Sequence, residues 1–171
     1  DSLYPKLFKD CDTRSYRDRS ASEDNLDELN EYIIANFEGY QRASLLLITQ
    51  IINTTGARPV SVASLSRYQF YKETVERVLF KEKKERFEVV PKNAKFGNSM
   101  AIGFPLSTTL YVMSFIKNDL EPFLTANHIN RYDGHLFLNT KTFRPLKTEQ
   151  IIKYFIARPK EIPPDFIAAN S

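Results

Sequence analysis

Apolar residues recur every three or four positions over two early stretches of the chain, which is the spacing of a buried helix face. The first stretch follows Ser22, a residue that suits a helix N-cap, and acidic residues fill the turn that comes next. Its apolar face consists of Leu26, Leu29, Ile33 and Phe37. We therefore predict an amphipathic helix that begins after Ser22 and ends at Gly39.

The second stretch is more apolar and runs to Ile52. Its predicted buried face consists of Leu45, Leu46, Ile48, Ile51 and Ile52. Gly56 is expected to end this helix, because glycine adopts the left-handed conformation at little steric cost. Pro59 suits the first turn of a following helix, where its missing N–H is not needed. Arg58 is thereby predicted to stand at a rigid corner between two helices.

Two short apolar stretches in the middle of the chain are typical of β-strands. They cover residues 87–90 and 100–104, and turn-forming residues lie between them. We predict an antiparallel hairpin from this pattern. Residues 74–84 fit a helix and a strand equally well, so both interpretations stay open.

A further helix is predicted from Thr108, and we expect it to end before Pro122, because proline interrupts helical hydrogen bonding. Its apolar positions are Leu110, Met113, Ile116 and Leu120. A turn at residues 132–134 precedes a short apolar segment, 135–138, and a last helix is predicted over residues 148–156. In this order the elements predict a mainly α fold with a small antiparallel β-sheet, of the α+β class.

The chain of 171 residues, 42% of them hydrophobic, is long enough for one domain with a buried core. We expect residues 1–21 to be a lead-in or linker and residues 22–171 to form the domain. The single Cys11 excludes an internal disulfide framework, and with only two His it leaves a structural metal site short of ligands. No apolar run reaches membrane length and no signal peptide is recognisable, so a cytoplasmic protein without a membrane partner is expected.

The charge of the chain neither requires nor excludes a nucleic-acid partner, because 24 Lys and Arg are set against 21 Asp and Glu. Binding to DNA would have to come from local clusters of basic residues. The two clusters are Arg14, Arg17 and Arg19 near the start, and Lys81, Lys83, Lys84 and Arg86 in the middle. Glu82 and Glu85 dilute the second cluster, as they would in a solvated face.

The corner between the two early helices carries the most specific chemistry. A guanidinium presents a fixed fork of donors that suits a phosphate, and a helix N-terminus beside it adds N–H groups. Pairing of Arg58 with a surface carboxylate is the alternative. The run T-G-A-R-P-V-S-V-A-S-L resembles the first catalytic box of the tyrosine recombinases (phage integrases), usually T-G-x-R-x-x-E-x-x-x-L. Thr55, Gly56, Arg58 and Leu65 match, while Ser61 stands where the family commonly has an acidic residue. The resemblance implies that Arg58 contacts the scissile phosphate.

The predicted hairpin extends the resemblance. Tyrosine recombinases carry a Lys on a β-turn between two strands, and the second strand closes with I-P-L, where this chain has F-P-L at residues 104–106. In the family this Lys is the general acid that protonates the leaving DNA oxygen. The resemblance implies that role for Lys92, with Lys95 as the runner-up. An ordinary exposed turn lysine is the alternative.

The resemblance covers residues 22–156 and then stops. Beyond residue 156, where the family's second half would follow, the sequence contains neither a His-x-x-Arg box nor a Tyr to serve as the C-terminal nucleophile. Tyr154 falls in a predicted amphipathic helix, and His128 and His135 are expected to be structural or surface residues. The chain is therefore expected to be either the N-terminal part of a recombinase catalytic domain, apparently incomplete, or a relative that has lost catalysis.

The resemblance implies site-specific DNA recombination by the full protein, with strand cleavage and rejoining through a covalent phosphotyrosine and without cofactor or metal. Double-stranded DNA would be the partner, the full protein would self-associate on it, and it would be associated with the nucleoid. A non-catalytic DNA-binding or protein-interaction domain derived from the same fold is the alternative. An unrelated helical domain is a third interpretation.

Overall fold

The computed structural model describes residues 23–92 and 100–151 of the chain. The chain divides into two compact units, of which one consists of residues 33–151 and the other joins residues 1–32 to 152–171. The candidate site lies within the unit of residues 33–151. None of the described helices is long and apolar enough to span a membrane.

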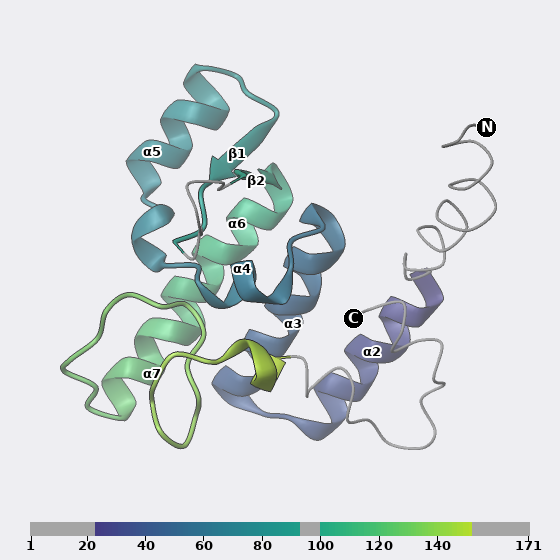
Figure 1. Ribbon diagram of the computed structural model, residues 1–171, viewed down its shortest axis with the longest axis vertical. Helices are drawn as coiled ribbons and strands as arrows, with labels where there is room; N and C mark the ends of the chain where they lie inside the picture. The colour runs from purple at the N-terminus through teal and green to yellow at the C-terminus, as the bar shows by residue number, and fades with distance from the viewer. Residues whose placement is uncertain (1–22, 93–99, 152–171) are drawn as a thin grey trace. The chain divides into compact units, whose positions relative to one another are not determined.

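Helix α3 (Gly39–Thr55) is the element on which the parts of this unit meet. It packs against α4 (Pro59–Ala63), α6 (Leu106–Phe115) and the strand β2 (Ile102–Pro105) (Figure 1). Its buried residues are Tyr40, Ser44, Leu45, Leu47, Ile48, Thr49 and Ile51. Burial of this mostly apolar face is the main stabilising contribution that the helix makes to the fold.

The burial of α3 follows its apolar pattern, but over a wider face than the pattern indicates. The predicted positions that are buried are Leu45, Ile48 and Ile51. Leu46 and Ile52 are only half-buried, whereas Leu47, which the pattern left out, is fully buried. Because α3 has neighbours on several sides, apolar residues away from the main stripe also lose contact with water.

The turn before α3 differs from the prediction. Helix α2 (Glu23–Asn36) ends at Asn36 rather than at Gly39. Gly39 has a φ of 57° and begins α3 instead. The predicted helix end was wrong in position because the left-handed glycine belongs to the turn between the two helices. Ser22, the predicted cap, lies outside the described residues.

A two-stranded antiparallel sheet confirms the predicted hairpin and, with the helices, the α+β class. Strand β1 (Arg86–Val89) pairs with β2 so that Phe87 faces Phe104. Both side chains are buried, and their rings pack on Phe70 with centroid distances of 5.7 and 5.2 Å. The residues that alternate with the buried ones along β1 are exposed, as expected for a sheet with one covered face.

Residues 72–81 are helical, so the helix interpretation of this region holds. Helix α5 (Lys72–Glu76) passes directly into a π-helical turn, η3 (Arg77–Lys81). Val75 and Leu79 are its buried side chains. Val75 and Leu79 are four positions apart, and residues with this spacing lie on the same side of a helix, here the side that is buried.

Pro122 does not end the preceding helix, contrary to the prediction. Helix α6 passes into a π-helical turn, η4 (Ile116–Leu120), and continues as α7 (Glu121–Ala126). In η4 the N–H of Glu121 donates to the carbonyl oxygen of Ile116, five residues back. The missing N–H of Pro122 then falls in the first turn of α7, where it costs little.

Two short backbone pairings involve the described chain after α7. Residues 65–67 pair with residues 134–136, and residues 137–139 pair with residues 144–146. Residues 148–151 begin the predicted last helix, whose remainder lies outside the described residues. The first of these pairings brings residues 65–67, which follow α4, next to residues 134–136, about 70 positions later in the sequence.

The hydroxyl of Tyr40 ties these segments to α3. It donates to the carbonyl oxygen of Leu136 across 2.7 Å and accepts from the N–H of Leu138 across 2.9 Å. The ring stacks on Phe123 with a centroid distance of 4.1 Å. Burial raises the pKa of Tyr40 to about 12, so the hydroxyl keeps its proton. One side chain thus satisfies two backbone groups of buried residues.

Candidate nucleic-acid interface

The corner that carries Arg58 has the backbone geometry that the sequence predicts. Gly56 follows α3 in the left-handed region, with φ 71° and ψ 13°. The Thr55 hydroxyl accepts from the N–H of Ala57 across 3.1 Å, inside the corner. Arg58 is extended, with φ −77° and ψ 152°, and Pro59 is the first residue of α4. The prediction of a helix-to-helix corner at Arg58 is confirmed.

The Arg58 side chain is exposed and has no hydrogen-bond or ion-pair partner among the residues that the structure describes. Its backbone is fixed, because its carbonyl oxygen accepts from the N–H groups of Ser61 and Val62 at 2.9 and 3.0 Å. A carboxylate partner for Arg58, the alternative interpretation, is therefore not present in the described part of the chain. Because α4 has only five residues, its N-terminus contributes little to the binding of an anion. The guanidinium of Arg58 is the group that is available to bind one.

Lys92 follows the buried Pro91 after β1 and is exposed. Within the described ranges its side chain has no bonded partner. Lys95, the runner-up, lies outside the described residues. Arg58 stands three residues after the end of α3, and β2, the second strand of the hairpin, packs against α3. That their two side chains reach one phosphate remains a prediction.

One side chain that the sequence analysis did not single out connects the corner to the hairpin. The amide oxygen of Gln69 accepts from the N–H of Ser66 across 2.9 Å, and the Ser66 hydroxyl accepts from the N–H of Tyr68 across 3.2 Å. The amide nitrogen of Gln69 donates to the carbonyl oxygen of Val90 across 2.8 Å. Val90 stands just before Lys92. The signal in the sequence is the Ser-x-x-Gln spacing of a capping box, which predicts the cap but not the link.

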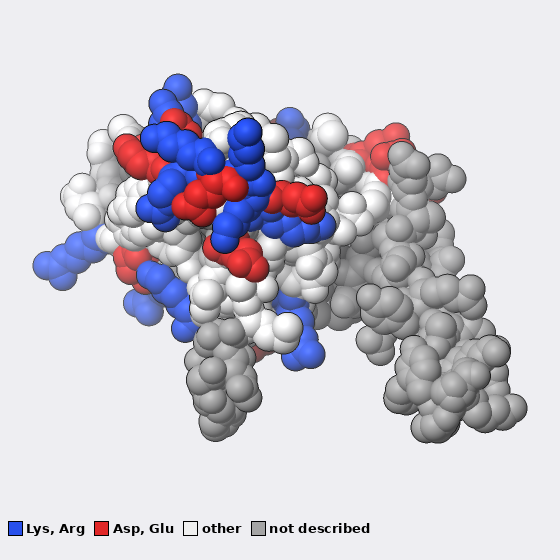
Figure 2. Space-filling model, turned by 90° about the horizontal axis from the view of Figure 1, so that it is seen from above, with Lys and Arg blue, Asp and Glu red and all other residues white. Residues whose placement is uncertain are grey.

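The charged face over α5, η3 and β1 is mixed rather than basic. Figure 2 shows Lys and Arg side chains interleaved with Asp and Glu on this side of the molecule. Arg77 pairs with Glu82 at 3.3 Å, and Lys72 pairs with Glu76 at 3.8 Å. The middle basic cluster belongs to this face: Lys81, Lys83, Lys84 and Arg86. It has the character of a solvated surface, and the basic cluster of residues 14–19 lies outside the described residues.

Among the tyrosines that the structure describes, three have shifted pKa values, and all three are shifted upward. Burial raises the pKa of Tyr40 to about 12 and also raises those of Tyr111 and Tyr132. An attacking phenol needs the opposite shift or an adjacent base. None of these three is therefore suited to be a nucleophile, and Tyr154 lies outside the described residues.

His135 is held by a carboxylate. Its Nδ1 lies 2.7 Å from Oδ1 of Asp133. Although burial raises the pKa of Asp133, the hydrogen bonds from His135 more than offset this, so that the pKa is lowered on balance. His128 is exposed at the turn after α7, with a φ of 52°.

The described residues contain no group of three or more His, Cys, Asp or Glu placed to hold a metal ion. Comparisons with protein-family models, with curated proteins and with solved structures found no match.

Proposed function

We propose that this chain is the phosphate-binding part of a protein that cleaves and rejoins DNA strands in the manner of the tyrosine recombinases. In the full protein a Tyr, which the described residues do not supply, attacks the phosphodiester. The covalent phosphotyrosine conserves the energy of that bond, so that no cofactor is needed. Duplex DNA is the partner, on which the full protein self-associates, and the nucleoid is where it acts.

The observation that carries this proposal is the state of Arg58. Its backbone is fixed between Gly56 and Pro59, and its exposed guanidinium has no partner among the described residues. A preorganised donor aimed at a phosphate stabilises the negative charge that builds up as the phosphorus becomes five-coordinate. Arg58 would take this part, and Lys92 would protonate the leaving oxygen as general acid.

A non-catalytic DNA-binding domain is the second candidate, and one observation favours it. Ser61 replaces the acidic residue that commonly supports the Arg in the family. Such a domain would use the same phosphate contact for binding alone.

Titration of a labelled duplex with this chain at several salt concentrations tests the DNA-binding part of the proposal. We expect weak binding that is largely independent of sequence and falls linearly in a plot of log K against log salt. Replacing Arg58 by Ala should lower the slope by about 1, because one phosphate contact is lost.

Arg77→Ala is the matched control, since Arg77 is also an exposed arginine but is paired with Glu82. It should leave the slope close to that of the unchanged chain. Absence of binding at low salt would rule out DNA as the partner. Equal effects of the two substitutions would mean that Arg58 is not a specific phosphate contact.

A further inference from the structure

A groove of about 540 Å³ runs between α4 and the segment of residues 144–149. The residues of its lining that bear on its chemistry are Val60, Ser64, His135, Arg144, Lys147 and Glu149. Nothing in the apolar pattern of the sequence marks this groove. It exists because α4 and a distant part of the chain are brought together.

The backbone pairings described above form the frame of the groove. Ser66, just after α4, bridges to His135, and Leu138 bridges to Pro145. The hydroxyl of Tyr40 holds the middle of this frame, because it bonds to the backbone on both sides of residue 137. The side chains along the groove are therefore carried by hydrogen-bonded segments rather than by free loops.

The chemistry of the groove is that of a cationic rim above an apolar surface. Arg144 and Lys147 are exposed, and neither side chain has a partner among the residues that the structure describes. Val60, on α4, and Leu146 supply apolar surface to the lining. A nucleic-acid backbone alternates charged phosphates with less polar sugars, so it matches such a lining. The negative charge of Glu149, on the same rim, would repel an anion and weaken its binding.

We infer that this groove binds a stretch of DNA sugar-phosphate backbone, with Arg144 and Lys147 as phosphate contacts. The inference rests on the proposed function, since it assumes that duplex DNA is the ligand. Arg58 is the N-cap residue of α4, and Val60, the second residue of this helix, lines the groove. Arg58 and the groove are thus both placed by α4, whose residues Val60 and Ala63 belong to the lining.

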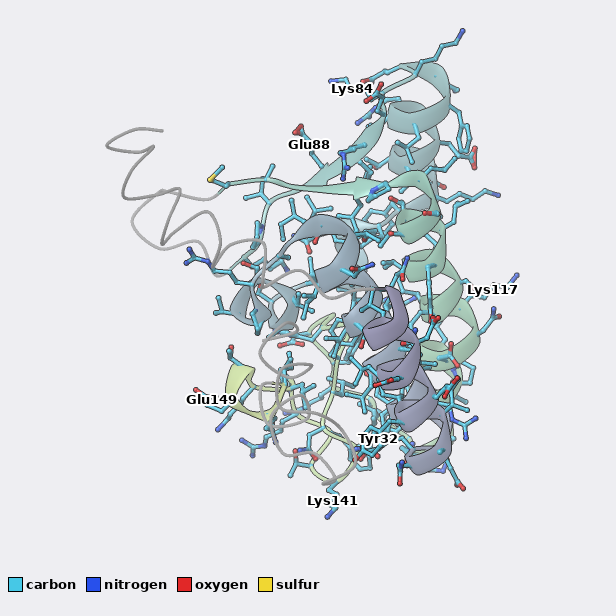
Figure 3. All side chains as sticks on the ribbon, turned by 90° about the vertical axis from the view of Figure 1, so that its right-hand side faces the viewer. Tyr32, Lys84, Glu88, Lys117, Lys141 and Glu149 are labelled. Carbon is cyan, nitrogen blue, oxygen red and sulfur yellow. The ribbon has the colours of Figure 1, made fainter. Side chains whose placement is uncertain are left out.

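Arg144→Ala tests the inference in the same salt titration, and Lys141→Ala is its matched control. Lys141 is an exposed cation of the same loop that does not line the groove, and Figure 3 shows it at the far end of that loop from Glu149. Arg144→Ala should weaken binding roughly fivefold to tenfold at 0.1 M salt and lower the slope by about 1. Lys141→Ala should change the affinity by less than about twofold.

Two more variants keep the test independent of folding defects. Glu149→Gln should strengthen DNA binding several-fold, because it removes a repelling charge from the rim. Arg144→Lys should retain the slope, because it retains the positive charge. Equal losses in Arg144→Ala and Lys141→Ala, or no gain in Glu149→Gln, would overturn the inference while DNA binding by the unchanged chain still stands. A chain that binds no DNA at low salt would overturn the proposed function and the groove assignment with it.

Discussion

The side-chain amide of Gln69 donates to the carbonyl oxygen of Val90 across 2.8 Å, and so joins the segment after the Arg58 corner to the hairpin that carries Lys92. The two residues are 21 positions apart in the sequence. The oxygen of the same amide accepts from the N–H of Ser66. One side chain therefore fixes the exit from α4 and the end of β1 at once.

Gln69→Glu should separate these two roles. A carboxylate still accepts from Ser66 N–H but cannot donate to Val90, so the cap is kept and the link is lost. We expect amide hydrogen exchange in the strands of residues 86–89 and 102–105 to become about fivefold faster, which corresponds to one net hydrogen bond of about 1 kcal/mol. Global stability should fall by less than about 1 kcal/mol.

Gln150→Glu is the control for this change, because the amide oxygen of Gln150 also accepts a backbone N–H, that of Lys147, at 2.8 Å. Its amide nitrogen has no partner among the described residues, so the substitution should leave exchange in the hairpin unchanged. Unaltered hairpin exchange in Gln69→Glu would show that the bond to Val90 does not hold the strands.

Tyr40 should make the protein sensitive to alkaline conditions. Below pH 10 its hydroxyl is protonated in both the folded and the unfolded state. Because burial raises the folded-state pKa from 10.0 to about 12, only the unfolded state loses the proton between these values. The free energy of unfolding should therefore fall as pH rises through this window, by up to about 1.4 kcal/mol per pH unit from this group. Chemical denaturation between pH 9 and 12 measures the slope.

Tyr40→Phe should reduce that slope and lower stability at neutral pH by about 2 kcal/mol, because Leu136 and Leu138 lose their partner. Tyr71→Phe is the control, since Tyr71 is exposed and should change stability by less than about 0.5 kcal/mol. Because burial also raises the pKa values of Tyr111 and Tyr132, part of the slope should remain in Tyr40→Phe. A slope that Tyr40→Phe leaves unchanged would contradict the contribution of Tyr40.

Gly134 should tolerate no side chain. It has a φ of 103°, and an added Cβ would lie 2.5 Å from Cε2 of Tyr68 and 2.8 Å from the hydroxyl of Ser66. Gly134→Ala should cost more than about 2 kcal/mol of stability and lower the melting temperature accordingly. Gly39→Ala, at a φ of 57° with nothing within 4 Å, should cost only about 1 kcal/mol. Equal losses in thermal unfolding would contradict a steric role for Gly134.

The parts of the fold that the sequence predicts correctly are those with a local cause. The apolar face of α3, the left-handed Gly56 and the Pro59 start of α4 each depend on residues within a few positions. The hairpin follows from two apolar strands around a turn-forming stretch. The Arg58 corner could therefore be predicted in position and in backbone conformation.

The parts that could not be predicted depend on contacts between distant residues. The Tyr40 hydroxyl reaches Leu136, 96 positions away, and no periodicity encodes that bond. Pro122 by itself predicts a helix end, because proline removes one hydrogen bond, yet a π-helical turn ahead of it accommodates the loss. The groove beside α4 likewise follows from pairing between segments that are far apart in sequence.

The role as general acid that we propose for Lys92 can be tested by the chemistry of the leaving group. Lys92→Ala in the full-length protein should slow cleavage of a normal DNA substrate, because the leaving oxygen then lacks its general acid. A substrate with sulfur in place of that oxygen should restore most of the rate, since sulfur leaves without protonation. If sulfur rescues Lys95→Ala and not Lys92→Ala, the acid is Lys95 and the mechanism is unchanged.

The role of Arg58 is tested most directly by single-turnover cleavage of a suicide DNA substrate with the full-length protein and its Arg58→Ala variant. A guanidinium aimed at transition-state charge contributes about 10²–10³ in rate, whereas one phosphate contact among many adds little to binding of the ground state. We therefore predict that Arg58→Ala binds the substrate within a few-fold of the unchanged protein and cleaves it at least about a hundredfold more slowly. Cleavage by Arg58→Ala at the normal rate would contradict the assignment of this chain to DNA strand cleavage.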